Sequence, residues 1–393
     1  MLNCANYTQT IAQIKCFLMH IQHKRGKVLH VLRKSPCKGQ HGSDMEKSKA
    51  TLRDVAKAAG VHISTASRAL KAEPQHRITP DVVERVRAVA SKLGYRVNAF
   101  ASSLRTKRSN AIGILIPDLW NPGFPAIVTG VQDVVSREGY EITIASDGNE
   151  LERHAAVIEN MLARQVDGLI LATAILKDPA IASLVSRNVP AVMVNRRDDQ
   201  GRAPSVVTDD ERGIALAVEH LASLGHRHIC HIAGPQNLST GVTRKRGFLE
   251  AAKALGLKVQ ESQIVVADSY SREAGARAAS RIITQNRQVT ALVVANDLLA
   301  LGCYESFHAS GIRCPADVSI TGYNDMPLVD LVSPPLTTVR VDHRQMGAEA
   351  AHLLLRRIAN TNAPVIDVVL RPTLVVRAST SSATSRRSSK RLS

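Results

Sequence analysis

From residue 111 onward, the sequence alternates short β-rich runs with amphipathic helical segments. The β-rich runs lie at 112–116, 142–145, 168–172, 191–194, 229–232, 264–266, 291–295 and 318–320. The helical segments between them include 127–138, 155–164, 213–224 and 298–310. Repeated alternation of this kind predicts an α/β fold with parallel sheets that are covered by helices on both faces. Ligands of such sheets bind beyond the carboxyl ends of the strands, so the loops after the strands form the candidate site.

A different pattern, of three short helices, precedes this region. Thr51 is predicted to cap the first helix, and Asp54 completes an acidic variant of the capping box. Gly60 ends that helix in a left-handed turn, and a second helix follows over about 62–70. The third helix starts after Thr79, with a proline at its first position. The side chains predicted to face inward are Val55, Ala56, Ala59, Ile63, Ala66, Ala69, Leu70, Val82, Val86, Val89 and Leu93.

The first two helices have the spacing of a helix-turn-helix, with the small Ala56 where the helices cross. Polar side chains on the second helix could reach base edges in the major groove of DNA. These side chains are Ser64, Thr65, Ser67 and Arg68. Arg68 suits bidentate pairing with a guanine. The pattern alone also allows an ordinary helical hairpin with a solvated polar face.

The net charge of +17 is concentrated outside the α/β region. Residues 45–110 carry 14 Lys/Arg and 5 Asp/Glu, whereas residues 111–378 carry 26 and 28. A compact basic segment beside a near-neutral domain indicates a module that binds a polyanion, joined to a separate sensor or enzyme. The enzyme patterns G-x-G-x-x-G, G-x-x-x-x-G-K-[ST] and G-x-S-x-G do not occur, so neither a cofactor nor a catalytic residue is expected.

Both ends of the chain are predicted to be disordered. Residues 1–44 show no helical or strand period, and residues 379–393 are rich in Ser, Thr and Arg. Met45 is the expected native start, with 1–44 as upstream sequence; a basic arm on DNA is the alternative. No signal peptide and no membrane-spanning run is recognisable. The six cysteines form no C-x-x-C pair, which favours a reducing cytoplasm over a disulfide framework or a zinc site.

Residues 225–231 are rich in side chains that can bind metals, three histidines and one cysteine. The segment runs into a predicted strand, where alternate side chains point to opposite faces. These side chains are therefore not expected to converge, and no metal site is predicted.

Residues 51–70 resemble the N-terminal headpiece of the LacI/GalR (lactose-repressor) family of bacterial transcriptional regulators. Residues 93–105 resemble the end of that family's third helix and its hinge, where only Val97 departs from the pattern Tyr-Arg-Pro-Asn-x-x-Ala-x-x-Leu. The resemblance reaches to about residue 378. It implies a helix-turn-helix DNA-binding domain at 45–97, a hinge helix and linker at 98–110, and an effector-binding and dimerisation domain at 111–378. That domain would be a two-lobed, periplasmic-binding-protein-like (type I) sensor, with lobe 1 at about 111–207 and 338–365 and lobe 2 at about 208–337 and 366–378.

The resemblance also implies which residues contact DNA. They are Thr51, His62, Ile63, Ser64, Thr65, Ser67, Arg68, Asn98, Leu104 and Arg105. Leu104 matches the leucine that paired hinge helices insert into the minor groove as an apolar wedge; a buried helix residue is the alternative. His62 replaces the family's usual serine and Lys71 its usual asparagine, so operator contacts there are expected to differ from the family norm.

Further family signatures lie in the sensor, at 116–124, 207–213, 224–228, 239–248, 294–302, 322–325 and 334–338. The resemblance places effector contacts on Asn121, Phe124, Asn195, Arg196, Arg244, Asn296 and Asn324. For each asparagine, the alternative is a polar residue that caps a loop.

Two of these positions bear on the charge of the effector. Asn195 and Asn324 stand where the family frequently has Asp, while Arg196 and Arg244 remain. A buried arginine without a carboxylate is poorly compensated, so the site is expected to take an anion such as a sugar acid, another hydroxy-carboxylate or a phosphorylated sugar. The opposing possibility is that an aspartate of the cleft supplies that charge, for which the candidates are Asp297 and Asp147.

The resemblance implies a cytoplasmic, nucleoid-associated homodimeric repressor of operator DNA, controlled by a small carbohydrate-type effector. Assembly is expected to stop at the dimer, because the tail after Arg377 has a single Leu392 and no apolar heptads. A transporter's solute-binding protein would need a signal peptide and no headpiece. A doubly wound enzyme would need a cofactor loop or a catalytic constellation.

Overall fold

The computed structural model describes residues 50–70, 78–95, 108–148, 150–286 and 288–383. The chain divides between Val97 and Asn98 into two compact units. The predictions for Lys71, Asn98, Leu104, Arg105 and residues 1–44 lie outside the described residues.

The first unit contains the three predicted helices, α2 (Leu52–Ala58), α3 (Ile63–Ala69) and α4 (Pro80–Lys92). The predicted capping box is confirmed: the backbone N–H of Thr51 donates to Asp54 Oδ2 at 2.9 Å, and the N–H of Asp54 donates to Thr51 Oγ1 at 3.3 Å. Gly60 has φ +65°, the left-handed conformation that the turn requires.

The core of this unit is a small cluster in which α2, α3 and α4 meet. Its buried members are Val55, Ala56, Ala59, Ala66, Ala69, Val83, Val86 and Ala90. The prediction that Ile63 and Leu93 face inward is wrong, because both side chains are 40% exposed. On α4, the predicted Val86 is buried and the predicted Val82 and Val89 pack half-buried against the same cluster, while Val83 and Ala90 are buried beside them.

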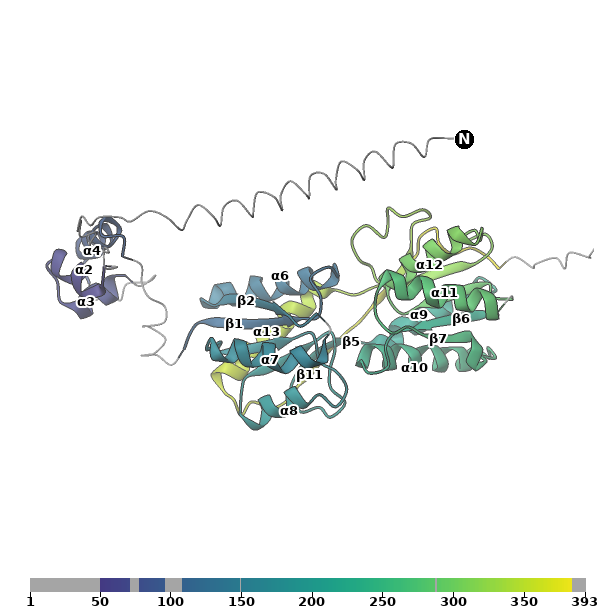
Figure 1. The fold of residues 1–393 in the computed structure, drawn as a ribbon, viewed down its shortest axis with the longest axis horizontal. Helices are drawn as coiled ribbons and strands as arrows, with labels where there is room; N and C mark the ends of the chain where they lie inside the picture. Colours follow the sequence, from purple (N-terminus) through teal and green to yellow (C-terminus); the bar gives the residue numbers. More distant parts are fainter. Residues whose placement is uncertain (1–49, 71–77, 96–107, 149, 287, 384–393) are drawn as a thin grey trace, which may run out of the picture. The chain divides into compact units, whose positions relative to one another are not determined.

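The second unit is built on two six-stranded sheets, one in each lobe (Figure 1). In spatial order, the first contains β11 (Asp367–Leu370), β5 (Ser205–Thr208), β4 (Ala191–Val194), β3 (Gly168–Leu171), β1 (Ala111–Ile116) and β2 (Glu141–Ser146). The second contains β12 (Thr373–Val375), β10 (Thr337–Arg340), β9 (Ser319–Asn324), β8 (Ala291–Val294), β6 (Ile229–Ala233) and β7 (Ile264–Val266). All strand pairs described here are parallel except β10 with β12, which confirms the predicted parallel α/β fold.

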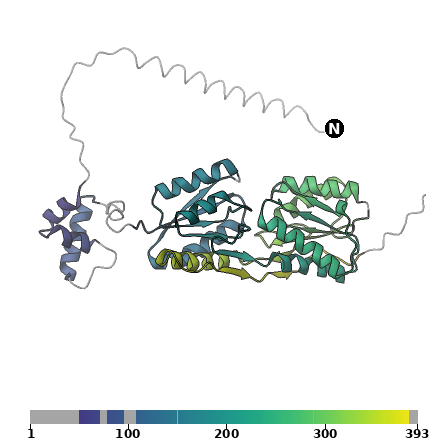
Figure 2. The same ribbon diagram turned by 90° about the horizontal axis from the view of Figure 1, so that it is seen from below.

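Helices cover both faces of each sheet (Figure 2). On the first sheet, α6 (Gly123–Val135) and α13 (His343–Ala359) lie opposite α7 (Leu151–Ala163) and α8 (Pro179–Ser186). On the second, α9 (Asp210–Ser223) and α10 (Ser239–Ala254) lie opposite α11 (Arg272–Gln285) and α12 (Asp297–Ala309). Neighbouring strand residues divide between the layers: in β3, Ile170 packs toward α6 and α13, and Leu169 and Leu171 pack toward α7 and α8.

The chain passes between the lobes after Thr208, after Arg340 and after Leu370, within the described residues. This differs from the expected lobe limits, which put 338–365 in the first lobe and 366–378 in the second. Instead, β10 pairs with β9 of the second lobe, and β11 pairs with β5 of the first. Backbone pairing decides the sheet to which such short strands belong, and their hydrophobic pattern does not reveal it.

The prediction of disorder from residue 379 onward is wrong for residues 379–383. Ser379 is fully buried, and its hydroxyl donates to the Ile320 carbonyl and accepts from the Thr337 N–H, both at 2.7 Å. The N–H of Ala383 donates to the Leu224 carbonyl at 2.9 Å. The serines whose frequency suggested disorder therefore form hydrogen bonds with backbone groups of the second lobe.

Candidate functional site

The first candidate site is the outer face of α3. Its N-cap is His62, whose Nδ1 accepts the N–H of Ser64 at 3.3 Å, so the histidine takes over the capping role of the serine usual in the family. The predicted DNA-contacting residues His62, Ile63 and Ser64 are exposed, and Thr65, Ser67 and Arg68 are half-buried. Arg68 donates from Nε to the Ser64 carbonyl at 3.1 Å. This face is polar and accessible, as a base-reading helix requires.

The second candidate site is a cleft in the α/β unit. All seven sequence-predicted effector residues line one small cavity there, of about 20 Å³. They are Asn121, Phe124, Asn195, Arg196, Arg244, Asn296 and Asn324. The remaining lining residues are Gly123, Thr240, Tyr270 and His343, none of which the sequence analysis proposed. Strand ends and helix starts from both lobes thus meet at this point, as the parallel topology predicts.

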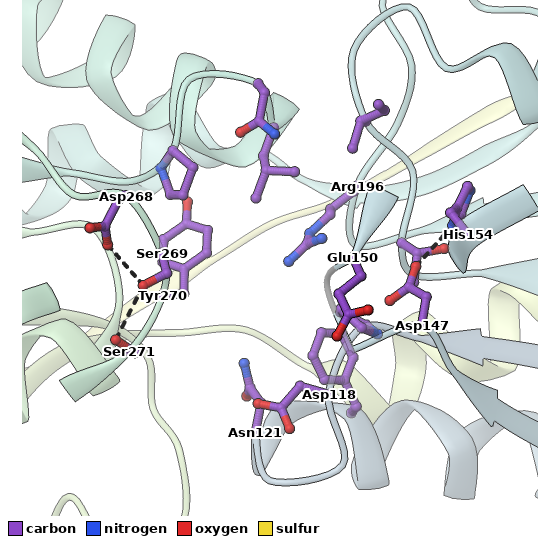
Figure 3. A pocket seen from close by; sticks show the side chains of 17 residues that line it. Asp118, Asn121, Asp147, Glu150, His154, Arg196, Asp268, Ser269, Tyr270 and Ser271 are labelled. Atoms are coloured by element: carbon purple, nitrogen blue, oxygen red, sulfur yellow. Dashed lines mark hydrogen bonds and ion pairs between the residues drawn. The ribbon is translucent and has the colours of Figure 1, made fainter. Parts of the chain in front are cut away.

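A larger cavity of about 230 Å³ adjoins the small one and shares Asn121, Phe124, Arg196 and Tyr270 with it (Figure 3). Its remaining polar lining side chains are Asp118, Asp147, Glu150, His154, Thr173, Asn237, Asp268, Ser269 and Ser271. Of these, only Asp147 was considered from the sequence, as a candidate counter-charge and not as an effector contact. The signal that could have found them is position, because 147–150 and 268–271 closely follow the strands β2 and β7.

Two asparagines of the small cavity bond locally. The Asn121 side chain accepts the N–H of Gly123 at 3.1 Å, and the Asn296 side chain caps α12 by accepting the N–H of Leu298 at 2.6 Å. Asn195 and Asn324 have left-handed backbones, with φ of 65° and 114°. The loop-capping role therefore applies to Asn121 and Asn296. It leaves each amide NH₂ group as a possible donor to a ligand.

Arg244 is compensated inside the protein, which corrects one premise of the anion expectation. Its Nε donates to Asp210 Oδ1 at 2.9 Å, and a terminal nitrogen donates to the Ala295 carbonyl at 2.7 Å. Its guanidinium also lies 3.8 Å from the centre of the Tyr323 ring. The carboxylate that pairs with Arg244 is that of Asp210, on the first turn of α9. It is neither of the two aspartates that the sequence suggested, Asp297 and Asp147.

Arg196 is the arginine without such a partner. Only 7% of the residue is exposed, and its Nε has no hydrogen-bond partner. Burial lowers the pKa of Arg196, although the nearby Asp147 favours its charged form. Figure 3 shows the guanidinium extending from one wall into the larger cavity. A buried cation with an unused donor is a site for an anionic or strongly accepting group.

A histidine held between two aspartates forms another part of the wall. His154 Nδ1 lies 2.9 Å from Asp147 Oδ2, and its Nε2 lies 3.4 Å from Asp178 Oδ2. All three residues are buried. Burial disfavours the imidazolium, but the hydrogen bond to Asp147 and the nearby Asp178 carboxylate outweigh it and raise the pKa of His154 to about 9.

We expect the protein to lose stability as the pH rises from about 6.5 to about 9, by an amount on the order of 2 kcal/mol. The folded state holds a proton on His154 that the unfolded chain releases, because the folded pKa is raised to about 9. This contribution to stability is fully present below the unfolded pKa of 6.5. It is lost as the pH rises through the folded pKa of about 9. Urea unfolding of wild type and His154→Gln across this range measures it. An equal pH slope in His154→Gln would contradict the assignment, and the exposed His308→Gln is the control.

No group of three or more His, Cys, Asp or Glu in the described part of the chain is placed to hold a metal ion. In the segment 225–231, His226 donates to the Ser381 carbonyl at 2.9 Å and His231 donates to the Val293 carbonyl at 2.8 Å. Their ring nitrogens thus serve the second lobe's own backbone. No described helix is both long and apolar enough to cross a membrane.

Two family models match the chain. One, for bacterial regulatory proteins of the lacI family, covers residues 51–98, and the other, a periplasmic binding protein-like domain, covers 218–380. The HTH-type transcriptional regulator DegA of Bacillus subtilis is 32% identical over 336 residues, which are 85% of this chain and 98% of DegA. The HTH-type transcriptional regulator MalR of Streptomyces coelicolor is 34% identical over 340 residues, 84% of this chain and 97% of MalR.

Solved structures agree with these matches. The lac repressor dimer bound to operator and the anti-inducer ONPF is 29% identical, with a TM-score of 0.76 over 84% of this chain and 99% of that chain. The complex of the transcriptional regulator CelR with cellobiose is 30% identical, with a TM-score of 0.64 over the same shares. A helix-turn-helix unit and a two-lobed, periplasmic-binding-protein-like unit define a DNA-binding transcriptional regulator and not an enzyme. The chain belongs to the LacI family of bacterial regulators.

Proposed function

We propose that this regulator is a homodimeric repressor in the cytoplasm, associated with the nucleoid, whose operator affinity is controlled by a small carbohydrate-type effector. Residues 45–97 would bind DNA, 98–110 would form the hinge, and 111–378 would bind the effector and dimerise. The lac repressor dimer on its operator supports the assembly, and the CelR complex with cellobiose supports the ligand class. An effector changes operator affinity only if it binds the two conformations differently.

We expect the full-length protein to select a preferred duplex from a random DNA library, with affinity that falls steeply between about 50 and about 200 mM salt. Arg68→Ala should weaken binding to the selected duplex by about 1–3 kcal/mol and relax base preference, because Arg68 lies on the accessible face of α3. Fluorescence anisotropy with selected and scrambled duplexes measures both effects. Arg137→Ala, an exposed arginine of the sensor, is the control. Affinity that is indifferent to salt, or unchanged discrimination in Arg68→Ala, would refute the proposal.

The effector is proposed to be an anionic carbohydrate, such as a sugar acid. The observation that carries this proposal is the buried Arg196, whose Nε is unpartnered and whose guanidinium faces the larger cavity. Its planar fork matches a carboxylate or phosphate bidentately. Asp118, Glu150 and Asp268 line the same cavity, and carboxylates accept hydrogen bonds strongly from sugar hydroxyls.

A matched pair of ligands tests the charge preference. In isothermal titration calorimetry with a panel of aldoses and their aldonates, we expect an aldonate to bind more tightly than its aldose. Arg196→Gln should weaken aldonate binding by about 10- to 100-fold and change aldose binding little, because one charge-assisted bidentate contact is removed. Arg246→Gln is the control, since Arg246 pairs with Glu211 at the surface.

A neutral sugar is the second candidate, and the Arg244–Asp210 pair favours it because that arginine already has its counter-charge. In that case the aldose of a pair would bind more tightly, and Arg196→Gln would affect both ligands equally. Either outcome would exclude the anionic effector while leaving the carbohydrate-controlled repressor intact.

A further inference from the structure

The effector proposal leaves unexplained why Arg196 forms no ion pair with a described residue, although acidic side chains line the same cavity. Three of the acids that line the cavity bond elsewhere. Glu150 lies 3.6 Å from Arg153 Nη1, and Asp268 lies 2.7 Å from Arg277 Nη2. Asp118 accepts the N–H of Trp120 at 2.7 Å.

Asp147 is the remaining acid of the cavity, and it favours the charged form of Arg196. It directly follows β2, whereas His154 lies on the first turn of α7. The Asp147 carboxylate is bonded to His154 at 2.9 Å, and this pair lines the same cavity as Arg196 (Figure 3). His154 thus binds the carboxylate that favours the charged form of Arg196.

On the other side of the imidazole ring, Asp178 fixes the position of His154 and favours its charged form. Asp178 lies 3.4 Å from Nε2 and is itself fixed by the N–H groups of Ile175 at 3.3 Å and Ala180 at 2.9 Å. These bonds and the histidine outweigh burial and lower the pKa of Asp178. The imidazolium therefore lies between two carboxylates, within a buried wall that does not bring it to the surface.

We propose that His154 is a specificity-determining positioning residue: by binding Asp147 it keeps that carboxylate from pairing with Arg196, and so leaves Arg196 to bind the anionic group of the effector. This inference rests on the anionic effector proposed above. The other titratable groups that act on Arg196 do not replace His154, because Arg244 is paired with Asp210 and the neutral Tyr270 donates to Thr240 Oγ1 at 3.1 Å. Without the imidazolium, Asp147 would neutralise Arg196, and the cavity would lose its preference for anions.

The test compares the ratio of aldonate to aldose affinity in the full-length protein, using the ligand pair that binds wild type most tightly. His154→Gln should lower this ratio about tenfold or more, since a close charge of this kind shifts ionic equilibria by one to three orders of magnitude. Asp147→Asn should not lower it, because the competing carboxylate is gone. The double variant His154→Gln/Asp147→Asn should restore the ratio toward wild type, which a purely structural role of His154 would not do.

Arg187→Gln is the matched control, since it removes a positive charge from the end of α8 where Arg187 pairs with Glu159 at the surface. Its ratio should equal that of wild type. An unchanged ratio in folded His154→Gln, or no recovery in the double variant, would overturn the inference while the Arg196→Gln result still supports an anionic effector. If His154→Gln does not fold, a lower ratio in Asp147→Asn would overturn it instead. If no aldonate binds wild type, both the anionic effector and this inference are wrong.

Discussion

Replacing Asp210 with Asn is expected to lower the free energy of unfolding by about 3–5 kcal/mol, because it leaves the buried Arg244 charge without its counter-ion. The side chains of Asp210 and Arg244 are only 8% and 4% exposed, so water cannot take over the lost interaction. Urea unfolding followed by circular dichroism measures the loss. Asp210→Asn combined with Arg244→Gln should be less destabilised than Asp210→Asn alone, since the uncompensated charge is then absent.

The adjacent residue provides a matched control for this prediction. Glu211 pairs with Arg246 between the same two helices, α9 and α10, but its side chain is 41% exposed and that of Arg246 is 55% exposed. Glu211→Gln should therefore cost less than about 1 kcal/mol. Equal losses in Asp210→Asn and Glu211→Gln would show that burial does not set the strength of the Arg244 pair.

The residues at the cleft were predictable from the sequence because loops after the strands of a parallel sheet meet at one edge. Asn121 and Asn296 come from the first and second lobe, and their motifs identified them although 175 positions separate them. Asp147, which directly follows a correctly predicted strand, was suggested only as a counter-charge. The motifs did not include Glu150, His154 or residues 268–271, so the larger cavity was missed.

The charge balance of the cleft was not predictable in the same way. Asp210 and Arg244 are on different helices, and only the packing of α9 against α10 brings their side chains to 2.9 Å. The sequence therefore suggested two uncompensated arginines in the cleft, whereas within the described part of the chain Arg244 has an acid partner and Arg196 has none. Pairings of this kind depend on side-chain direction, which loop motifs do not specify.

Short strands were the weakest part of the fold prediction. β5, β10, β11 and β12 contain three or four residues each and include Ser, Thr, Asp or Arg, so none of them is an uninterrupted apolar run such as β3, β4, β7 and β8 are. Three of them lie next to the points where the chain passes between the lobes, so missing them also displaced the expected lobe limits. The strands that were predicted are mostly central in their sheets, with uninterrupted apolar runs buried on both faces.

The helices α6 and α13 depend on glycine where they cross. A Cβ at Gly130 would meet the backbone carbonyl oxygen of Arg344, and a Cβ at Gly347 would meet that of Ile127. Each helix thus presents a glycine to the other's backbone. The same pair carries Phe124 and His343 at its N-terminal ends, and both residues line the small cavity. The close crossing therefore fixes one side of the candidate effector site.

Gly130→Ala is accordingly expected to destabilise the protein by about 3 kcal/mol or more, at the upper end of the usual cost of overpacking. The added methyl would collide with backbone atoms of Arg344 and Ala348, which cannot rotate away as a side chain could. The helices would have to separate, and their shared core around Ile127 and Met346 would lose contact. Thermal and urea unfolding measure the loss, with the exposed neighbour Thr129→Ala as the control. If Gly130→Ala unfolds like Thr129→Ala, the two helices do not pack as closely as described here.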